Sequence, residues 1–138
     1  MKNPGIAGFA LRVGLGLFFL VFGILKFVSS GPMTQMVYPS FWGGAAIPVL
    51  IYIIGVVQIV GGIILLVGWK TSITAIVLGV MHLGTMVVTL PRIISPFAFP
   101  EGGPPNFLFF SAVPILAALI ALVFTGAGSW SVEGESLT

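Results

Sequence analysis

The side chains that could do chemistry in this sequence are few, and most of them lie inside long apolar stretches. Gln58 and His82 stand twelve residues before and twelve residues after Lys70, so an antiparallel helical hairpin turning at Lys70 would place them at equal depth. Such a pair would form an interhelical hydrogen bond, typically worth about 0.6 kcal/mol in a membrane. The imidazole could instead hydrogen-bond a quinone carbonyl, pass a proton, or serve as one axial ligand of a haem. Gln58 and His82 are therefore candidate cofactor-binding residues.

Lys26 is the third candidate for a cofactor-binding role. It follows Arg12 by fourteen residues, which in a helix is about 21 Å, so it would reach the opposite membrane interface. There it could extend to the headgroups, pair with Glu101 or with loop carbonyls, or face a substrate under the outer loops.

Arg12 is a charge within an apolar stretch and needs a partner, since an unpaired arginine in a membrane costs roughly 2.5 to 3.5 kcal/mol on insertion scales. Glu133 lies in a tail that four spans return to the same side, so a structural ion pair between Arg12 and Glu133 is the leading interpretation. The alternatives are contact with lipid phosphate, or binding of an anionic substrate or quinone headgroup. Arg92 is interpreted as a headgroup anchor, and the three tryptophans as interfacial belts: Trp42, Trp69 and Trp130.

Several classes of function are excluded or disfavoured by what the chain lacks. It has no cysteine, so thiol chemistry, thiolate-ligated zinc and iron–sulfur clusters are excluded. Its single histidine has no carboxylate companions, so no catalytic metal is predicted, and there is no phosphate loop or nucleophile–base constellation. The net charge of +2 is too small to indicate a nucleic-acid partner. Independent catalysis by this chain is not expected.

The elements that must position these residues are four apolar stretches, approximately residues 5–27, 47–69, 72–90 and 107–125. Each is long enough to cross a hydrocarbon core about 30 Å thick, which takes about 20 helical residues. The composition agrees, with 58% apolar and 6% charged residues. We predict an all-α polytopic membrane protein, a single domain over residues 1–138 forming an antiparallel bundle of four transmembrane helices. The first stretch exceeds the core of a signal peptide and is predicted to be retained.

Each stretch carries small or polar residues at helical spacing, and these stripes are predicted to form the inner seam of the bundle. Small residues let helix backbones approach closely in lipid. The stripes are Arg12, Gly16, Phe19, Gly23 and Lys26; Pro48, Tyr52, Gly55, Gln58, Gly62, Leu65 and Trp69; Ala75, Gly79, His82, Met86 and Thr89; and Ser111, Pro114, Ala118, Ala121 and Thr125. The outward faces would meet the lipid bilayer or another subunit.

The distribution of basic residues indicates how the chain is oriented in the membrane. Lys2, Arg12 and Lys70 would share one side, against Lys26 and Arg92 on the other. The positive-inside rule then favours a cell-membrane protein with both termini cytoplasmic. The connections at residues 28–46 and 91–106 would lie outside.

Three segments carry a family resemblance: LRVGLGLFFLVFGILKF at residues 11–27, GVVQIVGGIILLVGW at 55–69 and TGAGSWSVE at 125–133. Together they closely resemble the DoxX family of small four-helix membrane proteins, and the terminal glycine-aromatic-acid motif is the most specific part. Gln58 stands where the family often has a glutamate, and Glu133 replaces the usual terminal aspartate. Unlike glutamate, the amide of Gln58 cannot carry a proton.

The resemblance implies a function that the composition alone does not indicate. Members of the family resemble the small subunit of thiosulfate:quinone oxidoreductase, so we expect an accessory or anchoring subunit of a membrane oxidoreductase, quinone-linked, with redox centres in other chains. One alternative is a stand-alone membrane protein that binds quinone or another small molecule. The other is a homo-oligomeric scaffold or small-solute transporter, although the absence of a broken helix pair argues against transport.

Overall fold

The computed structural model describes residues 4–28, 48–101 and 105–134. These ranges are all-helical, with α1 Pro4–Val28, α3 Pro48–Val67, α4 Thr71–Ile93, α5 Phe107–Phe110 and α6 Ala112–Thr125. Four segments are long and apolar enough to cross a membrane: Gly5–Val28, Val49–Val67, Thr71–Ile93 and Phe107–Thr125. The predicted fold class is confirmed. The connection at residues 29–47, with Trp42, lies outside the described residues.

Two helix boundaries differ from the sequence prediction, and each lies near a proline. The span expected to stop at Leu90 continues through Pro91 to Ile93, and Ile94 N–H closes the last turn on Leu90 O at 3.0 Å. A proline removes one helical hydrogen bond but need not end a helix so close to its terminus. The last span is divided at Ser111 into α5 and α6. Pro114 has no N–H for the preceding turn, and the neighbouring bond from Ile115 N–H to Ser111 O is stretched to 3.4 Å.

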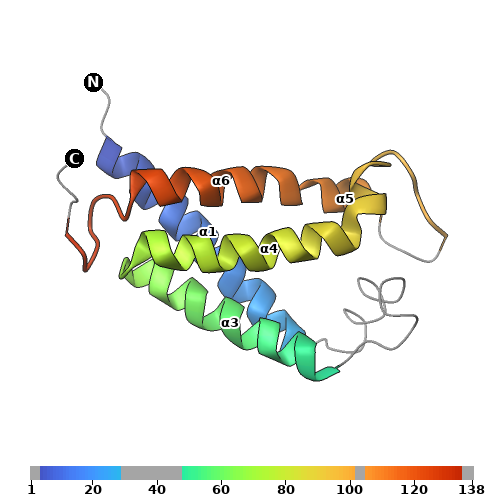
Figure 1. The fold of residues 1–138 in the computed structure, drawn as a ribbon, viewed down its shortest axis with the longest axis horizontal. Coiled ribbons are helices and arrows are strands. Elements are labelled where there is room, and N and C mark those ends of the chain that lie inside the picture. Colours follow the sequence, from blue (N-terminus) through green and yellow to red (C-terminus); the bar gives the residue numbers. More distant parts are fainter. Residues whose placement is uncertain (1–3, 29–47, 102–104, 135–138) are drawn as a thin grey trace.

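The helices are arranged as two pairs joined by a hairpin (Figure 1). α4 lies alongside α6, and α3 leaves the hairpin at an angle to α4. α1 crosses the bundle obliquely, from the α6 side at its N-terminal end to the α3 side at its C-terminal end. Its most extensive contact is with α3.

The contact between α1 and α3 is a seam of glycines. A Cβ added at Gly62 would lie 2.8 Å from both Gly16 O and Leu20 N, and one added at Gly23 would lie 2.9 Å from Gly55 O. No side chain fits between backbones this close. The whole predicted stripe of α1 is buried, from Arg12 to Lys26, so this part of the seam is confirmed.

The predicted stripe of α6 is wrong. Ser111, Pro114 and Thr125 are exposed, and the buried face instead presents Ala112, Leu119 and Leu122. These leucines join a core of larger side chains, so α6 is held by apolar packing rather than by close backbone approach. That core contains Leu15, Phe19, Leu65, Ala75, Leu78, Leu119 and Leu122.

A tight turn joins α3 to α4. Gly68 has φ 74° and Lys70 φ 45°, both in the left-handed region. Gly68 N–H bonds to Ile64 O at 2.9 Å and Trp69 N–H to Ile64 O at 3.2 Å, which ends α3 in the manner of a glycine C-cap. The turn therefore places the C-terminus of α3 beside the N-terminus of α4.

Candidate functional site

Arg12 is the centre of a hydrogen-bond network at the hairpin end of the bundle. Its side chain is 1% exposed. Nη1 donates to Leu66 O at 2.6 Å and Leu65 O at 3.2 Å, in the last turn of α3. Nε and Nη2 donate to the tail, the segment 126–134 that follows α6, at Ala127 O (3.0 Å), Ser129 O (3.2 Å) and Trp130 O (2.9 Å). Five N–H groups thus find five carbonyls, which is the full donor set of a guanidinium.

The tail, like Arg12, donates hydrogen bonds to the free carbonyls at the end of α3. Val132 N–H donates to Val67 O at 3.2 Å, and Glu133 N–H donates to Gly68 O at 3.1 Å. The last carbonyls of a helix have no intrahelical partner. Here those of Leu65, Leu66, Val67 and Gly68 all receive hydrogen bonds from Arg12 or from the tail. A cation at this position is also favoured by the helix dipole.

Glu133 takes a different partner from the one expected. Its Oε2 accepts a hydrogen bond from Thr71 N–H at 3.1 Å, at the first turn of α4, where the N-cap residue Lys70 supplies no side-chain bond. Carboxylates are stabilised at helix N-termini by free N–H groups and by the dipole. The structure therefore places Arg12 and Glu133 in one hydrogen-bond network. They are connected through the tail backbone and the hairpin rather than by a direct ion pair. Glu135, the other acid of the tail, lies outside the described residues.

Close backbone approach explains Gly128 of the tail motif. Gly128 has φ 70°, and a Cβ there would collide with Gly5 O and Phe9 N of α1. Ser129 N–H donates to Gly5 O at 2.9 Å. Trp130 also has a positive φ of 53°, and its ring packs edge-on against Phe9, with ring centroids 4.9 Å apart. Trp130 and Trp69 are exposed at this end of the bundle, as the belt interpretation expects.

Lys26 turns into the bundle instead of toward the outer interface. It is 7% exposed, and its Nζ donates to Gln58 Oε1 at 2.7 Å and, more weakly, to Phe22 O at 3.4 Å. Gln58 is likewise 7% exposed. The absence of a Cβ on Gly55 makes room for the lysine stem, since a Cβ there would lie 3.2 Å from Lys26 Cβ. Within the described ranges no carboxylate contacts this ammonium, and Glu101 is exposed elsewhere.

His82 and Gln58 do not meet, contrary to expectation. His82 is buried, with Nε2 3.0 Å from Ala112 O of α6 and its ring edge-on to Phe19 of α1 at 6.1 Å. α3 and α4 diverge after the hairpin (Figure 1), and the glycine seam turns Gln58 toward α1. Equal spacing from the turn therefore did not make Gln58 and His82 face each other.

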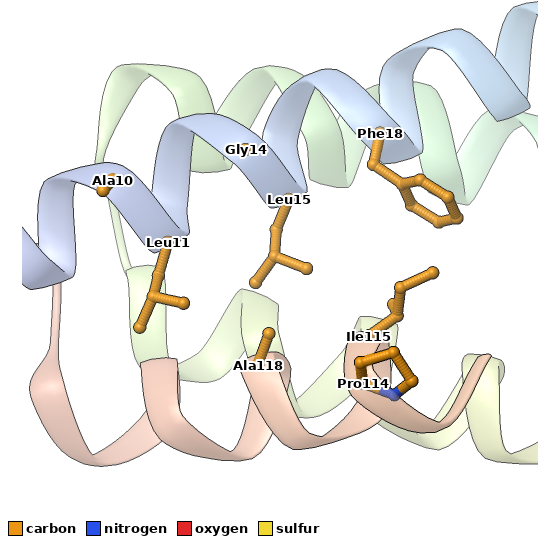
Figure 2. Close-up of a pocket in the computed structure, with 8 residues that line it drawn as sticks. All are labelled: Ala10, Leu11, Gly14, Leu15, Phe18, Pro114, Ile115 and Ala118. Atoms are coloured by element: carbon orange, nitrogen blue, oxygen red, sulfur yellow. The ribbon is translucent and has the colours of Figure 1, made fainter. Parts of the chain in front are cut away.

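An apolar groove of about 450 Å³ opens between α1 and α6 (Figure 2). None of the described residues that line it has a polar side chain. Gly14 and Ala10 on α1 and Pro114 and Ala118 on α6 contribute little side-chain bulk to its walls. Two members of the stripe predicted for the inner seam therefore line this groove. Its other walls are formed by Leu11, Leu15, Phe18 and Ile115.

Sequence reasoning missed a polar site at the opposite end of the bundle. The Arg92 guanidinium lies over the Phe109 ring, with Cζ 4.8 Å from the ring centroid. Asn106 is 6% exposed, with its N–H on Ala98 O and its Nδ2 on Ser95 O, both at 3.1 Å. An asparagine just before the last span was the available signal.

The fold and these polar sites define a multi-pass helical membrane protein with basic side chains buried in its bundle. The family model for DoxX matches residues 7–91, and the chain belongs to the DoxX family. It is 30% identical over 131 residues to the uncharacterized membrane protein Rv3486 of Mycobacterium tuberculosis, covering 89% of this chain and 77% of that protein. No solved structure matches the chain.

Proposed function

We propose that this protein is an accessory, membrane-anchoring subunit of a quinone-linked oxidoreductase. The observation that supports it best is the hydrogen bond from Lys26 of α1 to Gln58 of α3, a buried ammonium–amide pair with no carboxylate beside it among the described residues. An ionisable group retained at membrane depth is most often functional, because its insertion is costly.

The chemistry of the pair suits an oxygen acceptor. An ammonium has three N–H donors, and the two contacts of Lys26 Nζ leave one of them without a protein acceptor among the described residues. With Oε1 occupied by the lysine, the NH₂ group of Gln58 presents two more donors. A quinone carbonyl is a neutral acceptor that such donors can hold within an apolar environment. His82 is a second candidate, since a neutral imidazole bonded through Nε2–H keeps Nδ1 as an acceptor for a hydroquinone hydroxyl.

The anchoring role follows from the rest of the chain. Without cysteine the chain supplies no thiolate-ligated cluster. We therefore assign the site of the electron donor and the electron-carrying centres to partner chains. The extensive apolar faces of the four spans provide a surface for membrane-embedded partners. Resemblance to the small subunit of thiosulfate:quinone oxidoreductase supports the same assignment.

The test is purification of the full chain from its native membrane in mild detergent, with identification of copurifying chains and extraction of bound quinone. We expect a redox-cofactor-containing partner, and quinone that is lost in Lys26→Met and Gln58→Leu. Lys70→Asn is the control, because it removes an exposed lysine at the other end and asparagine tolerates the left-handed backbone there. A lone oligomer that retains quinone would instead support the stand-alone binding protein. A lone, quinone-free oligomer would refute both.

A further inference from the structure

Two buried polar atoms at the end of the bundle opposite the tail have no hydrogen-bond partner among the described residues. They are Arg92 Nη1, a donor, and Asn106 Oδ1, an acceptor. Buried polar atoms in native proteins are almost always paired, with protein, water or ligand. An unpaired buried donor or acceptor destabilises the protein, because it has lost its hydrogen bonds to water.

The two atoms belong to one neighbourhood. Asn106 is bonded to Ser95, which follows Arg92 by three residues, and the Arg92 guanidinium covers Phe109, which follows Asn106 by three residues. The amide orientation of Asn106 is fixed, because its Nδ2 must donate to Ser95 O. Oδ1 therefore remains the acceptor. A ligand that satisfies both residues must offer an acceptor to a guanidinium and a donor to an amide oxygen.

The position indicates which ligand this is. Arg92 lies in the last turn of α4 and Asn106 directly precedes α5, so the site is where two spans leave the membrane. Phe97 and Phe99 between them are 90% and 72% exposed, which is typical of side chains that enter the boundary between headgroups and acyl chains. The anionic group present at that boundary is lipid phosphate, which a guanidinium binds through charge-assisted hydrogen bonds.

We propose that Arg92 and Asn106 form a binding site for a phospholipid whose headgroup carries a hydrogen-bond donor beside its phosphate. The phosphate oxygen accepts from Arg92 Nη1, and the hydroxyl or ammonium of the headgroup donates to Asn106 Oδ1. Phosphatidylglycerol and phosphatidylethanolamine have both groups. Phosphatidylcholine has the phosphate but no donor, so it would leave Asn106 unsatisfied.

The experiment is native mass spectrometry of the full chain titrated with each of these three lipids. We expect phosphatidylglycerol and phosphatidylethanolamine to bind about tenfold more tightly than phosphatidylcholine, the effect of one hydrogen bond to a buried acceptor. Asn106→Leu should remove this preference while keeping residual binding, and Arg92→Met should weaken all three lipids. Lys70→Asn, at the other end of the bundle, should change neither.

The lipid comparison on the unaltered chain stands even if a variant fails to fold. Equal affinity for the three lipids would overturn the proposal and leave a bridging water as the partner of both atoms. A preference that survives Asn106→Leu would overturn the assignment of that residue. If phosphatidylglycerol binds more tightly while phosphatidylethanolamine binds no better than phosphatidylcholine, charge alone decides, which also contradicts the proposed role of the donor.

Discussion

Arg12 and Glu133 hold the tail by different bonds, and each also completes the end of a helix. Arg12 supplies donors at the C-terminus of α3, and Glu133 supplies an acceptor at the N-terminus of α4. Both signs of charge match the helix dipoles. The two helix ends that meet at the hairpin turn are therefore both stabilised electrostatically, by residues that are more than fifty positions away in sequence.

The first prediction is that these two residues are coupled through the tail. Arg12→Met should destabilise the protein by about 3 kcal/mol or more, because it leaves buried carbonyls without donors. Glu133→Gln should cost about 0.5 to 1 kcal/mol, the value of a charged helix cap. In the double variant the tail is already released, so the Glu133 change should add nothing. Melting temperatures in detergent give the cycle, and additive effects would show that the residues act independently.

The second prediction concerns the Lys26–Gln58 pair. Gln58→Leu should destabilise the protein because it leaves a buried ammonium with only the long contact to Phe22 O. Combining it with Lys26→Met removes the charge as well, so the double variant should be more stable than Gln58→Leu alone. Thermal unfolding in detergent measures both. If the double variant is less stable than Gln58→Leu alone, the Lys26 ammonium makes a stabilising interaction other than its hydrogen bond to Gln58.

At the scale of elements, the glycine seam fixes how closely α1 approaches α3. Glycine is ordinarily unfavourable within a helix, costing about 1 kcal/mol relative to alanine. The seam positions keep it because backbone atoms of the facing helix lie where a side chain would be. Some other glycines of the spans have no such contact. Gly79 and Gly84 of α4 have nothing within 4 Å of an added Cβ.

The third prediction uses this contrast. Gly62→Ala should destabilise the bundle, since the methyl group would lie 2.8 Å from backbone atoms that cannot move aside independently. Gly79→Ala should be neutral or slightly stabilising through helix propensity alone. The measurement is thermal stability of both variants in the same detergent. A neutral Gly62→Ala would contradict the close approach of α1 and α3.

At the scale of the whole molecule, a separate polar site lies at each of the two ends of the bundle. The start of α1, the hairpin and the tail meet at one end, joined by Arg12 and by the bond from Ser129 to Gly5. The Arg92–Asn106 site lies at the other end, where α4 finishes and α5 begins. Tail and hairpin must therefore face the same side of a membrane, whichever side that is.

The fourth prediction assigns that side. Because the charge bias favours cytoplasmic termini, Phe97→Cys should react with an impermeant thiol reagent in intact cells, while Lys70→Cys should react only after permeabilisation. Both positions are exposed, and the chain has no cysteine of its own to give a background signal. The reverse pattern would place the tail outside. Labelling of both residues in intact cells would show mixed orientation.

The sequence by itself determined the four spans and the inward face of α1. Both follow from properties that each residue carries alone: apolar length sets a span, and heptad spacing of Arg12, Gly16, Phe19, Gly23 and Lys26 sets a face. Family membership was also readable from the sequence, because it depends on the residues themselves.

Only the tertiary structure decided which groups meet. Arg12 bonds to backbone carbonyls, which every residue possesses and no sequence pattern marks, so a search for acidic side chains pointed to Glu133 instead. Gln58 turns to Lys26 rather than His82 because the glycine seam draws α3 toward α1 while α4 packs against α6. The small residues of α6 line a groove because leucines, not glycines, hold that helix. Spacing fixes depth and face along one helix, but the crossing of helices determines the partner.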